Sequence, residues 1–153
     1  MTVRSQPRAG GAGGRTQAVY YRDRSGAEPV NAIIDALREV AQETVDDQID
    51  LLNDLPADAP PLPFPHSSQV RGPLRELRCH RGKTLYRILY RRSGTLFVLL
   101  HMIEKRTGTI PELDIALAED CFRDFRARMD TERRVPPRAI GHDAPPKHRG
   151  GRP

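Results

Sequence analysis

The sequence predicts an α+β domain in which helices pack on a twisted, mainly antiparallel sheet of about four strands. Two observations support this class. A helical pattern over residues 30–55 precedes three strand-like segments between residues 74 and 104, and those segments are separated by connections of hairpin length. A second helical pattern follows after residue 109 and predicts a C-terminal helix.

The 153 residues suit one domain, which we place at residues 18–130, between two tails. Residues 1–17 and 131–153 consist mainly of Gly, Pro, Arg and small polar residues without periodicity, so we expect both to be disordered. The sequence has no run of about 18 apolar residues, which a membrane span would need, and the N-terminus lacks the apolar segment of a secretory signal. We therefore expect a cytoplasmic protein with no membrane partner.

The N-terminal part of the domain is expected to form a strand and a helical hairpin. AVYYRDR, from Ala18, has the aromatic and β-branched residues of a strand. Ser25 and Glu28 have the spacing of a capping box, with Pro29 in the first helical turn. Apolar residues then recur every three or four positions over residues 30–55, which predicts one helix or a hairpin bent near residues 42–44.

The sheet is predicted to follow a Pro-rich connector, residues 55–73, which is long enough to cross from the helices to the sheet. Its strands are placed at residues 74–80, 84–91 and 95–104, and the last should lie in the middle because it is the most continuously apolar. Thr109 and Glu112 form a second capping box, which opens a helix whose apolar residues recur every four positions: Leu113, Leu117, Cys121 and Phe125.

Charge is divided unevenly along the domain. Residues 28–58 hold nine acidic residues and one basic residue, whereas residues 70–108 hold ten basic residues and two acidic ones. The excess of bases in the strands cannot be neutralised locally, so one surface is suited to a polyanion, and a nucleic acid is the leading candidate. Single surface arginines, by contrast, are more often solvated or ion-paired.

Alternation along the strands sorts the arginines by face. Leu77 and Cys79 are expected to meet the face of Tyr86, Ile88 and Tyr90, which turns toward the helices. Arg78 and Arg87 then share the opposite face, and Lys105 can reach the same surface from the end of the last strand. Three cations on one sheet surface favour phosphate binding.

The two cysteines, Cys79 and Cys121, have no metal-ligand spacing and are interpreted as buried reduced thiols. The five histidines are too scattered to suggest a zinc site. We therefore expect neither a metal nor another cofactor.

Several short motifs, in order, resemble those of the phage-derived HigB-like toxins of the RelE/ParE superfamily. They are Glu76-Leu77-Arg78, Tyr86-Arg87-Ile88, and the run from Leu99 through His101 and Lys105 to Pro111-Glu112. The resemblance covers residues 18–128. It implies a RelE/ParE-like fold, metal-independent endoribonuclease cleavage of mRNA, usually on the ribosome, and inhibition by a cognate antitoxin, often a helix-turn-helix protein.

By motif, the resemblance makes Arg78, Arg87 and Lys105 the active-site cations, with Glu76 and His101 as secondary candidates. RNA carries its own nucleophile, the 2′-hydroxyl, so the enzyme has to hold the phosphate and stabilise the phosphorane. The identity of the general base stays open: either Glu76 serves, or the ribosome supplies the group, or catalysis is slow. Further residues are expected to bind the substrate RNA: Arg71, Arg75, Lys83, Tyr90 and Arg91.

Two other functions stay open from the sequence. A ParE-like inhibitor of DNA gyrase would not need Arg78, Arg87 or Lys105. A noncatalytic RNA-binding module would bind RNA in a salt-dependent manner without cleaving it.

Overall fold

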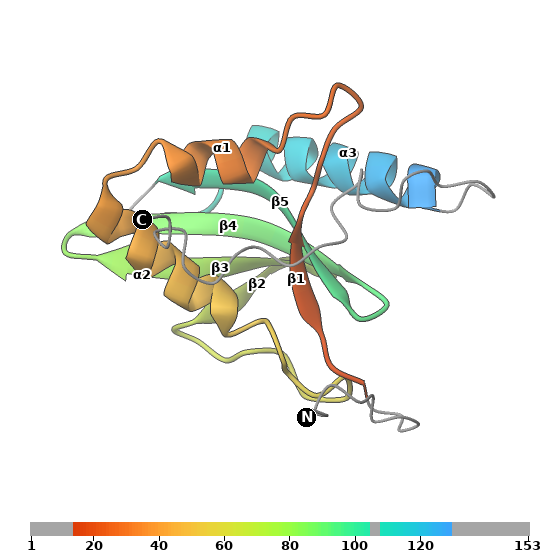
Figure 1. The fold of residues 1–153 in the computed structure, drawn as a ribbon, viewed down its shortest axis with the longest axis horizontal. Coiled ribbons are helices and arrows are strands. Elements are labelled where there is room, and N and C mark those ends of the chain that lie inside the picture. Colours follow the sequence, from red (N-terminus) through yellow and green to blue (C-terminus); the bar gives the residue numbers. More distant parts are fainter. Residues whose placement is uncertain (1–13, 105–107, 130–153) are drawn as a thin grey trace, which may run out of the picture.

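The computed structural model describes residues 14–104 and 108–129. They form five strands and three helices (Figure 1). In chain order these are β1 (Gln17–Tyr20), α1 (Pro29–Asp35), α2 (Glu39–Asp50), β2 (Ser67–Arg71), β3 (Leu74–Arg81), β4 (Thr84–Ser93), β5 (Leu96–Glu104) and α3 (Glu112–Met129). Residues 1–13 and 131–153 of the predicted tails, and Lys105, lie outside the described residues. Residues 14–17 of the predicted N-terminal tail are described: Gln17 begins β1, and the hydroxyl of the buried Thr16 donates to the carbonyl of Leu52.

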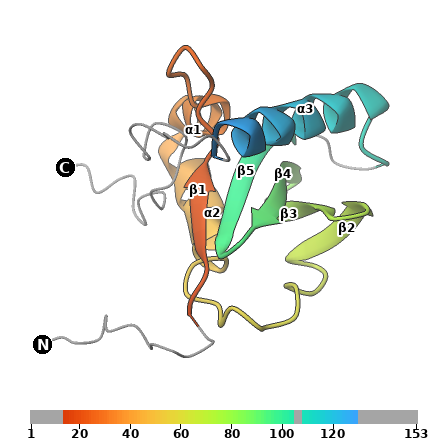
Figure 2. The same ribbon diagram turned by 90° about the vertical axis from the view of Figure 1, so that its right-hand side faces the viewer.

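The strands form one mixed sheet in the order β1-β5-β4-β3-β2, in which β1 runs parallel to β5 and the other neighbours are antiparallel. α1 and α2 lie on one face of this sheet and α3 on the other, which gives three layers (Figures 1 and 2). The predicted α+β class, the helical pair and the C-terminal helix are confirmed.

Each face of the sheet has its own apolar core. Leu77, Ile88 and Tyr90 pack against α1 and α2, whereas Leu89 and Val98 pack against α3. Both faces of the inner strands are therefore covered, which explains the nearly continuous apolar sequence of β5. α3 packs mainly on β5 and β4.

The register of the β3–β4 hairpin agrees with the face assignment from the sequence. Leu77 pairs with Ile88 and Arg78 pairs with Arg87, so the two arginines lie side by side on the α3 face. The turn between these strands places Gly82 at a φ of 60°, a left-handed conformation that favours glycine.

The predicted number and order of strands need correction. The Pro-rich connector contains β2, so the sheet has five strands rather than about four. β4 rather than β5 is the middle strand, because β1 adds to the outer side of β5. β2 is an edge strand whose exposed and covered residues alternate, so its sequence has little apolar signal.

The helix boundaries also differ from prediction. The chain bends between α1 and α2 at residues 36–38 rather than at 42–44, because the Gln42 side chain donates hydrogen bonds to the carbonyls of Ile34 and Asp35 at the end of α1. Ser25 does not cap α1. Its hydroxyl donates to Asp23, and α1 begins at Pro29 without a side-chain cap.

The second capping box is wrong for a similar reason. α3 begins at Glu112, which was expected to lie in the third helical position, and the first carbonyl to accept helical hydrogen bonds is that of Pro111. Thr109 therefore lies before the helix rather than at its cap.

Candidate functional site

A polar groove lies on the α3 side of the sheet, between β2 and the beginning of α3. Its volume is about 400 Å³. α3 leaves this part of the face open because it packs mainly on β5 and β4. The lining residues come from β2, β3, β4, the segment that leads into α3 and the start of α3: Gln69, Val70, Arg71, Glu76, Arg87, Gly108, Thr109, Ile110, Glu112 and Ile115.

A buried ion pair between Glu76 and Arg87 lies in this groove. Glu76 is 4% exposed and Arg87 is 6% exposed. Arg87 Nε donates to Glu76 Oε1 at 2.6 Å, and Arg87 Nη1 donates to the carbonyl of Gly108 at 2.9 Å. Buried charges are stable only when they are paired and hydrogen-bonded, and this pair meets both conditions.

Arg78 extends this cluster toward the sheet edge. It faces Arg87 across the hairpin, and two guanidinium groups in that position repel each other. Glu76 offsets the repulsion because its Oε2 accepts from Arg78 Nη1 at 3.2 Å as well as lying 3.5 Å from Arg87 Nη2. Ser68, on β2, donates a further hydrogen bond of 2.6 Å to the same oxygen.

The surroundings of Glu76 determine its ionisation. Burial alone would raise the pKa of this carboxyl, but hydrogen bonds from Arg87 and Ser68 and the charges of Arg87 and Arg78 outweigh it and lower the pKa. Glu76 is thus a stable carboxylate and a weak proton acceptor.

Arg78 is the more accessible of the two central arginines. Its side chain is 15% exposed, compared with 7% for that of Arg87. Among the described residues, Arg78 Nε has no hydrogen-bond partner although it is buried. Because this atom is buried, a phosphate oxygen can reach Arg78 only through the part of its side chain that remains exposed.

Other predicted site residues on this side of the sheet lie around the groove. Arg71 is at its rim, in an exposed ion pair with Glu112. His101 is bonded to Asp114 of α3 at 2.7 Å and is not among the groove-lining residues. Arg91 pairs with Glu119 and lies over the ring of Phe122, which places it against α3.

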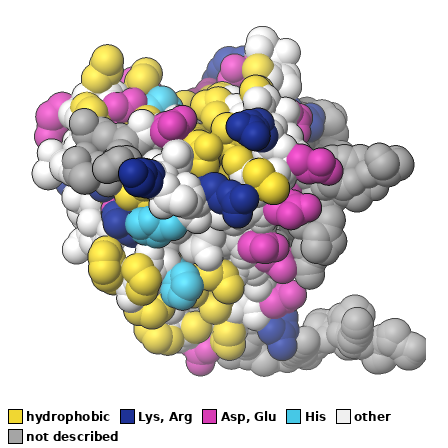
Figure 3. Space-filling view, turned by 90° about the vertical axis from the view of Figure 1, so that its left-hand side faces the viewer, with side chains coloured by type: hydrophobic (Ala, Val, Ile, Leu, Met, Phe, Trp, Pro, Cys, Tyr) yellow, Lys and Arg dark blue, Asp and Glu magenta, His cyan; other side chains and the backbone are white. Residues whose placement is uncertain are grey.

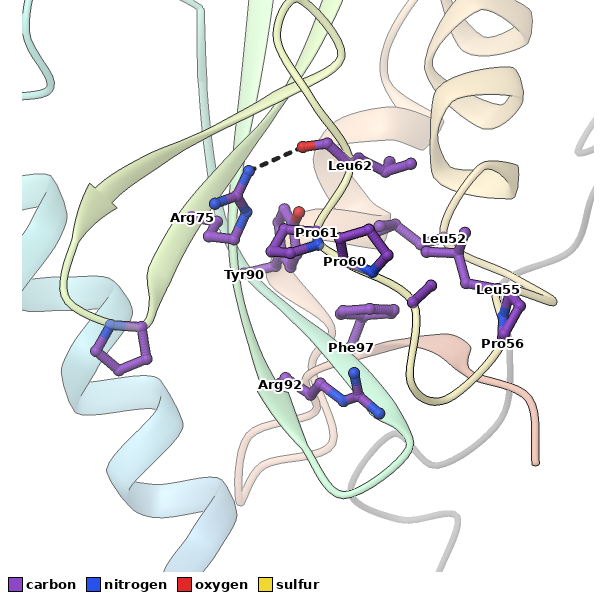
Figure 4. Close-up of a pocket in the computed structure, with 12 residues that line it drawn as sticks. Leu52, Leu55, Pro56, Pro60, Pro61, Leu62, Arg75, Tyr90, Arg92 and Phe97 are labelled. Carbon is purple, nitrogen blue, oxygen red and sulfur yellow. Dashed lines mark hydrogen bonds between the residues drawn. The ribbon is translucent and has the colours of Figure 1, made fainter. Parts of the chain in front are cut away.

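Arg75 and Tyr90 lie on the opposite face. They line a mainly apolar pocket of about 160 Å³ between the Pro-rich connector and the sheet (Figure 4). Figure 4 shows the Arg75 guanidinium bonded to the carbonyl of Leu62, at 2.9 Å, and Arg92 at another side of the pocket. Tyr90 is 2% exposed and its hydroxyl bonds to Ser67. The structure therefore does not bring Arg75 and Tyr90 together with Arg78.

The remaining predicted residue, Lys83, is exposed in the β3–β4 turn. The end of the molecule that carries this turn shows Lys, Arg and His side chains among apolar ones, with acidic side chains on the right and at the upper left (Figure 3). No three His, Cys, Asp or Glu side chains gather around a possible metal position within residues 14–104 and 108–129.

Two residues of the site were missed in the sequence. Ser68 fixes Glu76, and Phe64 lies against Arg78, with the guanidinium carbon 4.9 Å from the ring centroid. Both belong to the connector that we interpreted as a link between the helices and the sheet. An aromatic residue within a run of prolines was the available signal.

Comparison with known proteins gave one match. A model for the family described as "Phage derived protein Gp49-like (DUF891)" matches residues 32–123, a stretch from α1 into α3 that includes the whole groove. No curated protein and no solved structure gave a significant match. None of the described helices has the length and hydrophobicity needed to cross a bilayer.

Proposed function

Since the chain belongs to the Gp49-like family of phage-derived proteins, a toxin-associated family similar to RelE and HigB, we propose that it is the toxin of a type II toxin–antitoxin pair. We further propose that it is an endoribonuclease that cleaves mRNA on the ribosome. The observation that carries the second proposal is the Glu76–Arg87–Arg78 cluster, in which Glu76 and Arg87 line the polar groove and Arg78 bonds to Glu76 beside it.

In this proposal the groove binds the scissile phosphate of RNA. The 2′-hydroxyl attacks the adjacent phosphorus, and the charge that develops on the phosphoryl oxygens needs fixed cationic donors. Arg78 makes the direct contact because it is the more accessible of the two arginines. Lys105, which the motif places among the active-site cations, donates to the leaving oxygen.

Arg87 and Glu76 have a supporting part. Their mutual bond holds both groups, and Glu76 in turn holds Arg78. Because the same contacts lower the pKa of Glu76, we assign it the positioning of the arginines rather than removal of the 2′-hydroxyl proton. We assign proton removal to a group supplied by the ribosome, which makes cleavage ribosome-dependent.

The family assignment also implies an antitoxin partner. We propose a helix-turn-helix protein encoded beside this chain, which binds the toxin and blocks access of RNA to the groove. Co-expression with the product of the neighbouring reading frame should restore growth.

The test is expression without the antitoxin, with mapping of mRNA 5′ ends, for the wild type and the Arg78→Ala variant. We expect Arg78→Ala to slow cleavage by roughly 10²–10³-fold, because it removes a donor to the phosphorane. Arg123→Ala is the matched control, since Arg123 pairs with Asp120 on α3 and its side chain is 71% exposed. It should cleave like the wild type.

Two outcomes would refute this function. Growth arrest with DNA damage and intact mRNA would identify a gyrase inhibitor. RNA binding without cleavage, even with ribosomes present, would identify a noncatalytic module.

A further inference from the structure

Phe64 differs from every other aromatic residue of the chain. It is 67% exposed, whereas the four tyrosines and the other three phenylalanines are each 9% exposed or less. The chain has no tryptophan. One large aromatic surface is therefore in contact with solvent, and the core does not need it.

The backbone holds this ring in a defined position. Phe64 lies between two prolines, and the carbonyl of Pro63 accepts hydrogen bonds from the amides of His66, at 2.9 Å, and Ser67, at 3.1 Å. β2 begins at Ser67, so the turn is joined directly to the sheet. A ring presented on a hydrogen-bonded turn loses little conformational entropy when it binds a ligand.

The ring is also linked to the groove. The guanidinium of Arg78 lies over it, and the same guanidinium bonds to Glu76, the partner of Arg87. One side chain therefore separates the exposed ring from the buried ion pair. A phosphate held by Arg78 would have its own nucleoside, or the next one, within reach of the ring.

We propose that Phe64 is a stacking platform for an unpaired RNA base at the entrance to the groove. Single-stranded RNA is commonly held by bases that stack on aromatic rings and on guanidinium groups, and Phe64 and Arg78 supply both. The inference depends on the proposed ribonuclease function and adds to it a residue that positions the substrate.

The surroundings of Phe64 favour RNA over an apolar protein partner. The other large hydrophobic side chains exposed in the described structure lie on or beside helices, and none belongs to β2 or β3: Ile33, Val40, Leu51, Leu113 and Leu117. On β3 and in its turn, the neighbours of Arg78 are instead exposed and basic or titratable: His80, Arg81 and Lys83. A single ring among cations suits a base with its phosphate.

A Phe64→Trp variant tests the proposal directly, because it has a single indole whose fluorescence a stacked base quenches. The probe is a short single-stranded RNA with 2′-O-methyl groups, which binds without being cleaved. We expect saturable quenching with an affinity close to that of the wild type. Phe64→Ala should weaken binding by about 5- to 100-fold, the usual range for loss of one stacked base.

Two controls isolate stacking from charge. Inorganic polyphosphate has no bases and should bind without quenching the indole. Ile33→Trp places an indole on α1, across the sheet from the groove, and RNA should leave its fluorescence unchanged.

Unquenched fluorescence at saturating RNA, or equal affinity of the wild type and Phe64→Ala, would overturn the stacking proposal. If mRNA cleavage persists in that case, the proposed function stands without it. If the wild type neither binds nor cleaves RNA while the indole responds to the antitoxin, both proposals fail and Phe64 belongs to a protein interface.

Discussion

Replacement of Arg87 by Met tests how strongly the fold depends on the buried ion pair. The side chains of Arg87 and Glu76 are 7% and 5% exposed, and their closest atoms are 2.6 Å apart. Arg87→Met keeps most of the side-chain volume, but it leaves the buried Glu76 carboxylate with hydrogen bonds from Arg78 and Ser68 and without those from Arg87. Breaking such a pair costs about 3–5 kcal/mol, a large share of a total stability of about 5–15 kcal/mol.

Urea unfolding followed by circular dichroism measures this loss, and the melting temperature should fall by roughly 10–20 °C. Arg71→Met is the matched control, because Arg71 also bonds to a glutamate, Glu112, but both side chains are more than half exposed. It should leave the unfolding free energy unchanged within error. Adding Glu76→Gln to Arg87→Met removes the buried charge and should recover about 1–2 kcal/mol.

If Arg87→Met and Arg71→Met lower the unfolding free energy by similar amounts, burial does not determine the strength of these ion pairs, because burial is the main difference between them. The same result affects the choice of catalytic variants. If Arg87→Met unfolds easily, loss of toxicity in that variant reports stability, and Arg78→Ala is the better test of catalysis.

Three further predictions follow. The pKa of Glu76 is lowered in the fold, so its carboxylate stabilises the folded protein. This contribution is complete above the unfolded pKa of about 4.3 and is lost as the pH falls through the folded pKa. The difference in unfolding free energy between the wild type and Glu76→Gln should therefore shrink from pH 7 to pH 3. Tyr90→Phe should lower the unfolding free energy by about 1–2 kcal/mol, because it removes the buried hydrogen bond to Ser67, and it should leave mRNA cleavage unchanged. Reduced cleavage by a stable Tyr90→Phe variant would contradict the placement of Tyr90 on the face opposite the groove. Burial raises the pKa of the Cys121 thiol to about 11, so iodoacetamide at pH 8 should alkylate it far more slowly than a peptide thiol, and buried Cys79 should react only after unfolding.

The part of the fold that local pattern determines was predictable from the sequence. Alternation in β3 and β4, with a short Gly-containing turn between them, predicted that Arg78 and Arg87 share a face, and the observed register has them paired. The prediction was correct because side chains alternate between the two faces of a strand, and because a short turn allows only a few pairing registers between the strands that it joins.

Features that depend on distant segments were not predictable in the same way. Arg87 is buried partly because the chain near Gly108 covers it, and no local pattern in β4 indicates that cover. β2 was missed because an edge strand with one covered face needs few apolar residues. Tyr90 was expected to bind RNA, yet its neighbours on the helix side of the sheet bury it.

The parallel pairing of β1 with β5 has a consequence for synthesis of the chain. β1 is the first strand to be made, but its partners, from Leu96 to Leu99, come near the end of the described domain. Pairing across such a separation has a high loop-closure cost and folds late, after the local β3–β4–β5 meander. The start of α3, which lines the groove, is made later still. A nascent chain therefore lacks a complete groove until almost the whole domain has been translated.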